Sequence, residues 1–150
     1  MDILSNFGET LKELISMRNI NTVELEAQTN IDCTSYSKYL NKKVIPTLPN
    51  AITIADFFGC SLDYLFGLTN EFEKENYLPY QPFSKSFQEI LKSHKCTRYR
   101  ISKDLGIHNN TVTDWFYGRR IPTIDNLIIT AKYLGCSLDE LVGRKPVEKI

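Results

Sequence analysis

The chain has 150 residues, of which 42% are hydrophobic and 24% are charged, with a formal net charge of zero. This composition suits one globular domain or two small ones of about 70 residues. No run of about 18 apolar residues occurs, and the first residues include acids where a secretory signal would carry basic residues and an apolar stretch. We therefore expect a cytoplasmic protein without a membrane span.

The cysteines and histidines give no sign of a metal or catalytic site. The four cysteines lie too far apart for a CxxC zinc motif. We expect reduced thiols, with Cys60 and Cys136 filling small spaces in the core. No Cys/His or Ser/His/Asp signature surrounds either histidine. The sequence thus predicts no metal, no cofactor and no enzymatic activity.

The chain repeats itself at a spacing of 76 residues, which aligns residues 7–67 with residues 83–143. In the later part, 45–67 against 121–143, thirteen of 23 pairs are identical. In the earlier part only three of 38 pairs are identical. The repeat therefore predicts two copies of one small domain whose front halves have diverged.

The first copy is predicted to fold as five short helices. Leu11, Leu14 and Ile15 fall on one face of the first helix, and Asn30 favours a left-handed turn after the second. The four later helices are expected at 22–29, 32–41, 47–58 and 61–66.

Residues 70–82 separate the two copies and are predicted to form a linker. The segment is polar and contains two prolines. Tyr77, Leu78 and Tyr80 indicate that part of it lies against a domain, since a free tether favours Gly and Ser.

The second copy repeats the five-helix plan. Phe87, Ile90 and Leu91 form a helical stripe. Four polar residues are expected to cap helix N-termini: Thr97, His108, Thr123 and Ser137. Four glycines are expected to end helices: Gly106, Gly118, Gly135 and Gly143.

The stretch "TRYRISKDLGIHNNTVTDWFYGRRIPTIDNLIITAKYLGCSLDELVG" resembles the lambda-repressor-like, Cro/XRE class of helix-turn-helix domain. The resemblance extends over the whole stretch and recurs in the first copy. It implies an all-α fold of two tandem five-helix bundles. The expected domains are 1–69, which is acidic, and 83–146, which is basic, joined by the linker 70–82.

The resemblance also implies that the third helix of each bundle enters the major groove of double-stranded DNA. In the second copy the base-reading positions are Asn109, Asn110, Thr113 and Asp114. Asn suits adenine and Asp can accept from cytosine. Alternatively, the two asparagines only favour the start of a helix.

Phosphate contacts are implied at four positions of the second copy: Arg98, Thr111, Arg119 and Arg120. The last two could alternatively be ordinary solvated charges. The first copy offers a second candidate DNA site of weaker chemistry at Cys33, Thr34, Ser37, Lys38, Lys42 and Lys43. There, Thr22 and Glu24 stand where the second copy has Arg98 and Arg100.

Charge divides the chain. Residues 1–70 carry five basic and eight acidic residues, or −3; residues 71–82 carry −2; and residues 83–150 carry twelve basic and seven acidic residues, or +5. We therefore expect a sequence-specific DNA-binding transcriptional regulator, such as a repressor, that binds chiefly through its C-terminal domain. The alternative is a protein-interaction module, of antitoxin or anti-repressor type, whose N-terminal domain binds a protein partner.

Two arrangements on DNA stay open at this point. Because half-sites lie about 34 Å apart, one chain could imitate a dimer with its two domains if the linker extends to about 40 Å. Alternatively, a homodimer formed through the acidic N-terminal domains could read a palindrome with its two C-terminal domains.

Overall fold

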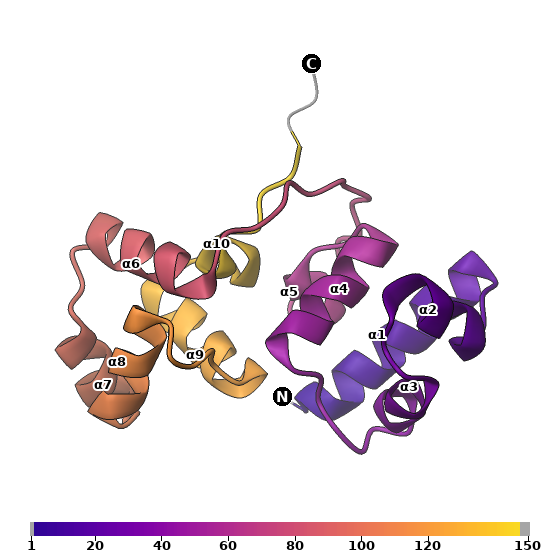
Figure 1. Cartoon of the computed structure of the whole chain (residues 1–150), viewed down its shortest axis with the longest axis horizontal. Coiled ribbons are helices and arrows are strands. Elements are labelled where there is room, and N and C mark those ends of the chain that lie inside the picture. The colour runs from indigo at the N-terminus through magenta and orange to yellow at the C-terminus, as the bar shows by residue number, and fades with distance from the viewer. Residues whose placement is uncertain (1, 148–150) are drawn as a thin grey trace. The chain divides into compact units, whose positions relative to one another are not determined.

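The computed structural model describes residues 2–147, and the chain divides into two compact units between Asn76 and Tyr77. This boundary lies inside the segment predicted to be the linker. Within the described residues the regular elements are ten helices, which confirms the predicted all-α fold of two five-helix bundles (Figure 1). No helix in this part of the chain is both long and apolar enough to cross a bilayer.

The first unit is built from five helices around an aromatic core. They are α1 (Ile3–Arg18), α2 (Thr22–Thr29), α3 (Cys33–Leu40), α4 (Leu48–Phe58) and α5 (Leu62–Leu65). α1 packs against α3 and α5, and α2 packs against α3 and α4. Phe7 of α1 is fully buried, stacked on Phe66 at 5.3 Å and edge-on to Tyr39 at 5.4 Å between ring centroids. These rings fix α3 against α1.

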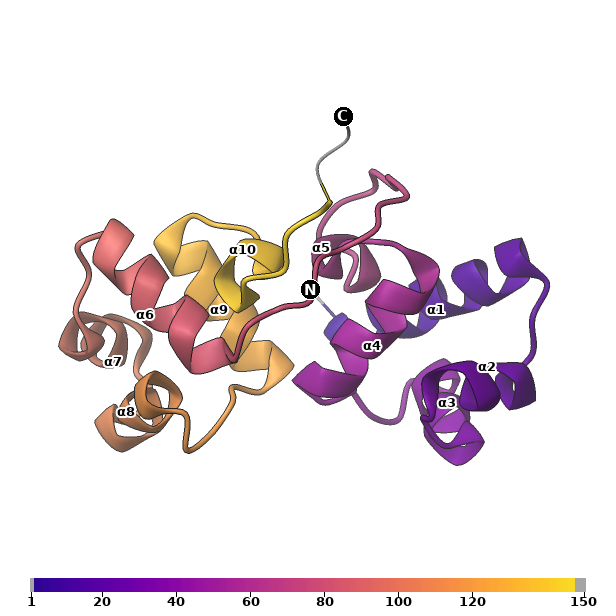
Figure 2. The same ribbon diagram turned by 45° about the horizontal axis from the view of Figure 1, so that its top comes forward.

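The second unit repeats this plan with its own aromatic pair. Its helices are α6 (Phe83–Ser93), α7 (Arg98–Leu105), α8 (Asn109–Tyr117), α9 (Ile124–Leu134) and α10 (Leu138–Val142). Figure 2 shows α8 beside α7, and α8 also packs against α6. Phe87 and Trp115, both buried, meet edge-on at 6.0 Å and hold α8 on α6.

The predicted helix boundaries are confirmed by the cap geometry. Each of Thr97, His108, Thr123 and Ser137 accepts a hydrogen bond from a backbone N–H in the first turn of its helix. The glycines predicted to end these four helices all have positive φ, between 68° and 79°. In the first unit Asn30 takes the left-handed conformation with φ 61°. Asn tolerates this conformation better than most residues do.

The cysteine prediction is correct for Cys60 but wrong for Cys136. All four cysteines are free of disulfides, and Cys60 is fully buried, whereas Cys136 is half-buried. In the first unit the linker covers the turn before Cys60, because Glu75 donates its backbone N–H to the Gly59 carbonyl at 2.8 Å. At the matching turn of the second unit, a Cβ placed on Gly135 meets no atom of residues 2–147 within 4 Å apart from its chain neighbours and its own helix, so this turn stays open.

Residues 70–82 lie against the two units and do not form a free tether. In the first unit Phe72 meets Tyr64 edge-on at 5.2 Å. In the second unit the guanidinium of buried Arg144 lies 3.5 Å from the ring centroid of Tyr77, and Leu78 donates its N–H to the Lys145 carbonyl. The extended linker of about 40 Å would therefore require these contacts to open.

Candidate nucleic-acid interface

The N-terminus of α8 presents polar side chains to solvent. His108 caps the helix, and its Nδ1 accepts a hydrogen bond from the backbone N–H of Asn110 at 3.1 Å. Asn109 and Asn110 are exposed, and neither side chain makes a hydrogen bond within residues 2–147. Because His108 provides the cap, the two asparagine side chains remain available to an incoming ligand.

One face of α8 is polar and the other is buried. On the polar face, Thr113 follows Asn109 by one helical turn, and Asp114 follows Asn110 by one turn. The two asparagines are exposed, and Thr113 and Asp114 are half-buried. Val112 and Trp115 on the other face are buried in the unit's core. The helix therefore shows its four predicted base-reading residues together.

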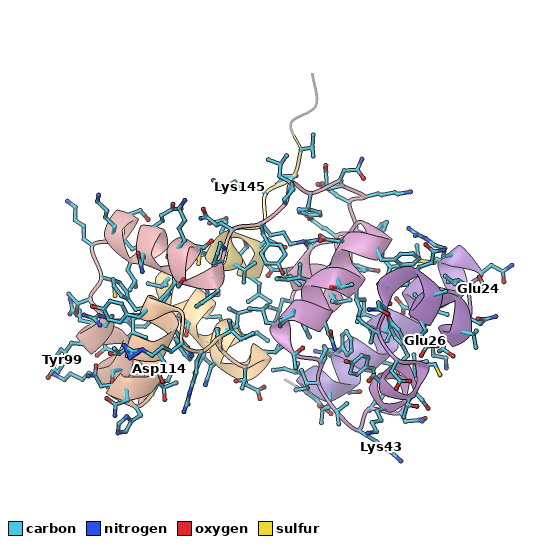
Figure 3. All side chains as sticks on the ribbon, in the orientation of Figure 1. Glu24, Glu26, Lys43, Tyr99, Asp114 and Lys145 are labelled. Carbon is cyan, nitrogen blue, oxygen red and sulfur yellow. The ribbon has the colours of Figure 1, made fainter. Side chains whose placement is uncertain are left out.

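Asp114 joins this polar face to the arginines that follow the helix. Figure 3 shows Asp114 on α8. Its carboxylate lies 3.4 Å from Nη1 of Arg119 and 3.4 Å from Nε of Arg120. The two arginine side chains are 60% and 64% exposed. Gly118 turns the chain at φ 79°, and the backbone N–H of Arg119 binds the Asp114 carbonyl at 2.9 Å. The carboxylate therefore orients both guanidinium groups from its place on the polar face of the helix.

Arg98 reaches the same region from α7. Its guanidinium carbon lies 4.5 Å from the ring centroid of Phe116 and 5.1 Å from that of Tyr117. Tyr117 also lies 5.4 Å from the guanidinium of Arg119. The fourth predicted phosphate residue, Thr111, is half-buried, and its backbone N–H binds the His108 carbonyl. The structure thus brings three cationic groups around the C-terminal end of α8.

The N-terminus of α3, the matching helix of the first unit, carries two carboxylates. Asp32 accepts the backbone N–H of Thr34 at 2.9 Å, and Glu26 accepts that of Cys33 at 3.1 Å. The hydrogen bond from the Thr34 backbone lowers the pKa of Asp32 below its usual value. In the second unit Ser102 replaces Glu26 and donates its hydroxyl to the Ile107 carbonyl at 2.6 Å.

The second candidate DNA site is therefore chemically different from the first. Cys33 is half-buried, whereas the small polar and cationic residues of this site are all exposed: Thr34, Ser37, Lys38, Lys42 and Lys43. Lys42 forms an ion pair with Glu9 of α1, and this pairing lowers the pKa of that carboxyl. One of the predicted cations is thus already paired within the unit.

Comparisons with known families agree with this geometry. A family model described as "Helix-turn-helix domain" matches residues 8–71, and one described as "Helix-turn-helix" matches residues 87–141. The chain carries two tandem helix-turn-helix domains of the lambda-repressor-like, Cro/XRE class. Comparison of the chain with curated proteins and with solved structures found no match.

In the first helix-turn-helix domain, Glu26, Asp32 and Cys33 also bring three potential metal-ligand atoms within 4.8 Å of one another. The two carboxylates are exposed, and each already accepts a backbone hydrogen bond. Capping of α3 therefore accounts for this group without a metal.

In the second helix-turn-helix domain the sequence identifies the cations but not their partners. Phe116 and Tyr117 contact Arg98 although they lie 18 and 19 residues away in the chain. No spacing rule links such distant positions. The adjacency of aromatic residues to Arg119 in "WFYGRR" is the one signal that the sequence offers.

Proposed function

We propose that the chain is a sequence-specific DNA-binding transcriptional regulator whose second domain places α8 in the major groove. The observation that carries this proposal is the solvent-facing set of Asn109, Asn110, Thr113 and Asp114 beside the paired Arg119 and Arg120. Side-chain amides can pair with adenine through two hydrogen bonds at once, and guanidinium groups bind phosphates. A helix that docks in the major groove needs polar side chains that face the bases and cations at the edge that face the phosphates.

Regulation follows from occupancy in this proposal. A helix-turn-helix domain bound at an operator blocks or recruits other proteins there, and no bond is made or broken. Repression is the simplest such outcome, because a bound protein excludes polymerase from the same stretch of DNA.

The second domain is proposed as the main DNA reader because the two recognition helices differ in charge at their N-termini. α8 begins with Asn109 and Asn110 after its His108 cap, and none of these carries a carboxylate. α3 begins beside the carboxylates of Glu26 and Asp32. A helix N-terminus attracts anions through its free N–H groups. In α3 two of those groups are already bound by the chain's own anions, so a DNA phosphate would meet repulsion.

The same observation favours a separate role for the first domain. An acidic helix-turn-helix surface suits contact with a protein better than contact with DNA. In the second candidate function, this domain binds a protein partner or a second copy of the chain, so that two C-terminal domains read a palindrome.

Fluorescence anisotropy of labelled mixed-sequence duplex DNA, titrated with the full chain at about 50 and 200 mM salt, tests the proposal. We expect binding that unlabelled DNA competes away. Between the two salt concentrations, the binding constant should fall by a factor of about ten or more for every few phosphates that the protein contacts. Absence of binding at the lower salt concentration would contradict DNA binding and would favour the protein-interaction module.

A further inference from the structure

One exposed aromatic ring in the second domain lies between two arginines from different elements. Tyr117 is the last residue of α8 and is 56% exposed. Arg98 begins α7 and lies 5.1 Å from the Tyr117 ring centroid, while Arg119 follows α8 and lies 5.4 Å from it. A ring this exposed contributes little to the core, so core packing does not explain why it contacts both guanidinium groups.

The neighbouring ring strengthens the arrangement. Phe116 is half-buried, and the Arg98 guanidinium lies 4.5 Å from its centroid. The Phe116 carbonyl accepts a hydrogen bond from Nε2 of Gln88 at 2.6 Å, which ties this end of α8 to α6. The rings that contact the arginines are therefore fixed to the scaffold.

Arg98 keeps its positive charge available. Within residues 2–147 it makes no ion pair with a carboxylate, unlike Arg119 and Arg120, which share Asp114. Stacking on an aromatic face restricts a guanidinium group without using its N–H donors, so those donors can still bind an anion.

The first domain lacks both the arginine and the two aromatic rings at the matching positions. At the positions of Arg98, Phe116 and Tyr117 it has Thr22, Leu40 and Asn41. The arginine and both rings thus occur as a set in one copy and are all absent from the other. Such a set is expected if the rings serve the arginine.

We propose that Tyr117, supported by Phe116, is a positioning residue that holds Arg98 and Arg119 oriented for DNA phosphates. This inference rests on the proposed DNA binding by the second domain. A long cationic side chain normally loses conformational freedom when it binds, and a ring that restricts it beforehand reduces that loss. Tyr117 itself need not touch the DNA.

The test compares Tyr117→Leu with Tyr117→Phe in the full chain, using labelled mixed-sequence duplex DNA over about 50 to 200 mM salt. We expect Tyr117→Leu to weaken binding about three- to tenfold and to make the slope of log K against log salt shallower by about 1, the loss of one phosphate contact. Tyr117→Phe keeps the ring and should behave as the wild type does.

Phe57→Leu is the matched control, because it removes a ring 4.8 Å from the Arg18 guanidinium in the first domain. It should leave the slope unchanged, and unchanged Trp115 fluorescence would show that the second domain of each variant is folded. An unchanged slope and affinity for Tyr117→Leu would overturn the inference, as would a Tyr117→Phe variant as weak as Tyr117→Leu. If the wild type binds no DNA, the proposed function itself fails, and the positioning role with it.

Discussion

The carboxylate of Glu26 accepts a hydrogen bond from the backbone N–H of Cys33 at 3.1 Å, at the start of α3. In the second domain the residue at this position is Ser102, whose hydroxyl donates to a carbonyl and leaves the start of α8 without an added charge. Figure 3 shows Glu26 near α3 and Glu24 on the same domain. We expect these two acidic residues to weaken any approach of DNA to the first domain.

Glu24→Arg combined with Glu26→Ser gives the first domain the residues of the second at these positions. Because two negative charges are removed and one cation is added, we expect tighter binding to mixed-sequence duplex DNA. The slope of log K against log salt should steepen by about 0.9 for each additional phosphate that the domain neutralises. Anisotropy titrations at several salt concentrations measure this change. Unchanged affinity and slope would show that the carboxylates are not what keeps this domain from DNA.

Phe87→Ala should destabilise the second domain by about 3 to 5 kcal/mol, because it leaves a cavity beside Trp115 in a buried aromatic pair. Trp115 is the single tryptophan, so its fluorescence reports the unfolding of this domain in urea. The variant should also lose DNA binding under conditions in which the domain unfolds.

Leu11→Ala is the control for Phe87→Ala, since Leu11 occupies the matching position of the first domain and is fully buried. It should destabilise that domain by about 2 to 5 kcal/mol and leave the Trp115 transition in place. A Trp115 transition that shifts equally in both variants would contradict two separately folded domains.

Asp32 should make the stability of the first domain depend on acid pH. Its pKa in the folded chain lies below the ordinary value of 3.8, chiefly because of the hydrogen bond from the Thr34 backbone. The charged carboxylate therefore stabilises the fold above pH 3.8, and this contribution is lost as the pH falls through the lowered pKa.

Asp32→Asn keeps a capping oxygen but does not titrate, so the wild type should be the more stable chain at neutral pH and lose that advantage in acid. Urea unfolding followed by circular dichroism at several pH values measures the difference. Trp115 fluorescence should give the same transition in both chains. A stability difference that is constant from neutral pH to about pH 2 would contradict the assignment.

Asp114→Asn removes the carboxylate shared by Arg119 and Arg120. Binding to mixed-sequence DNA should become tighter, because a negative charge leaves the proposed interface. Discrimination between a selected site and mixed sequence should fall by about 1 to 3 kcal/mol, if Asp114 reads a base. Competition titrations with both DNAs measure the two effects. Discrimination equal to that of the wild type would contradict base reading by Asp114.

The fold was largely predictable because local chemistry determines it. Capping residues such as Thr97 and His108, and the glycines that follow each helix, act within a few residues of their own position. The incomplete burial of Cys136 could not be predicted in this way, since the cover of a turn depends on segments that are distant in the chain. The contact of Arg98 with Phe116, and the capping of α3 by Glu26, likewise depend on how separate helices meet.

Base reading by Asn109 and Asn110 is the step on which the proposed regulator depends. Selection of bound sequences from a random duplex pool measures it, with the wild-type chain, the Asn109→Ala/Asn110→Ala variant and, as a matched control, Cys33→Ala/Thr34→Ala. We predict one enriched motif that the control retains and that the asparagine variant loses, while that variant still binds mixed-sequence DNA. Enrichment of the same motif by the asparagine variant, or of none by the wild type, would contradict base reading by these two residues.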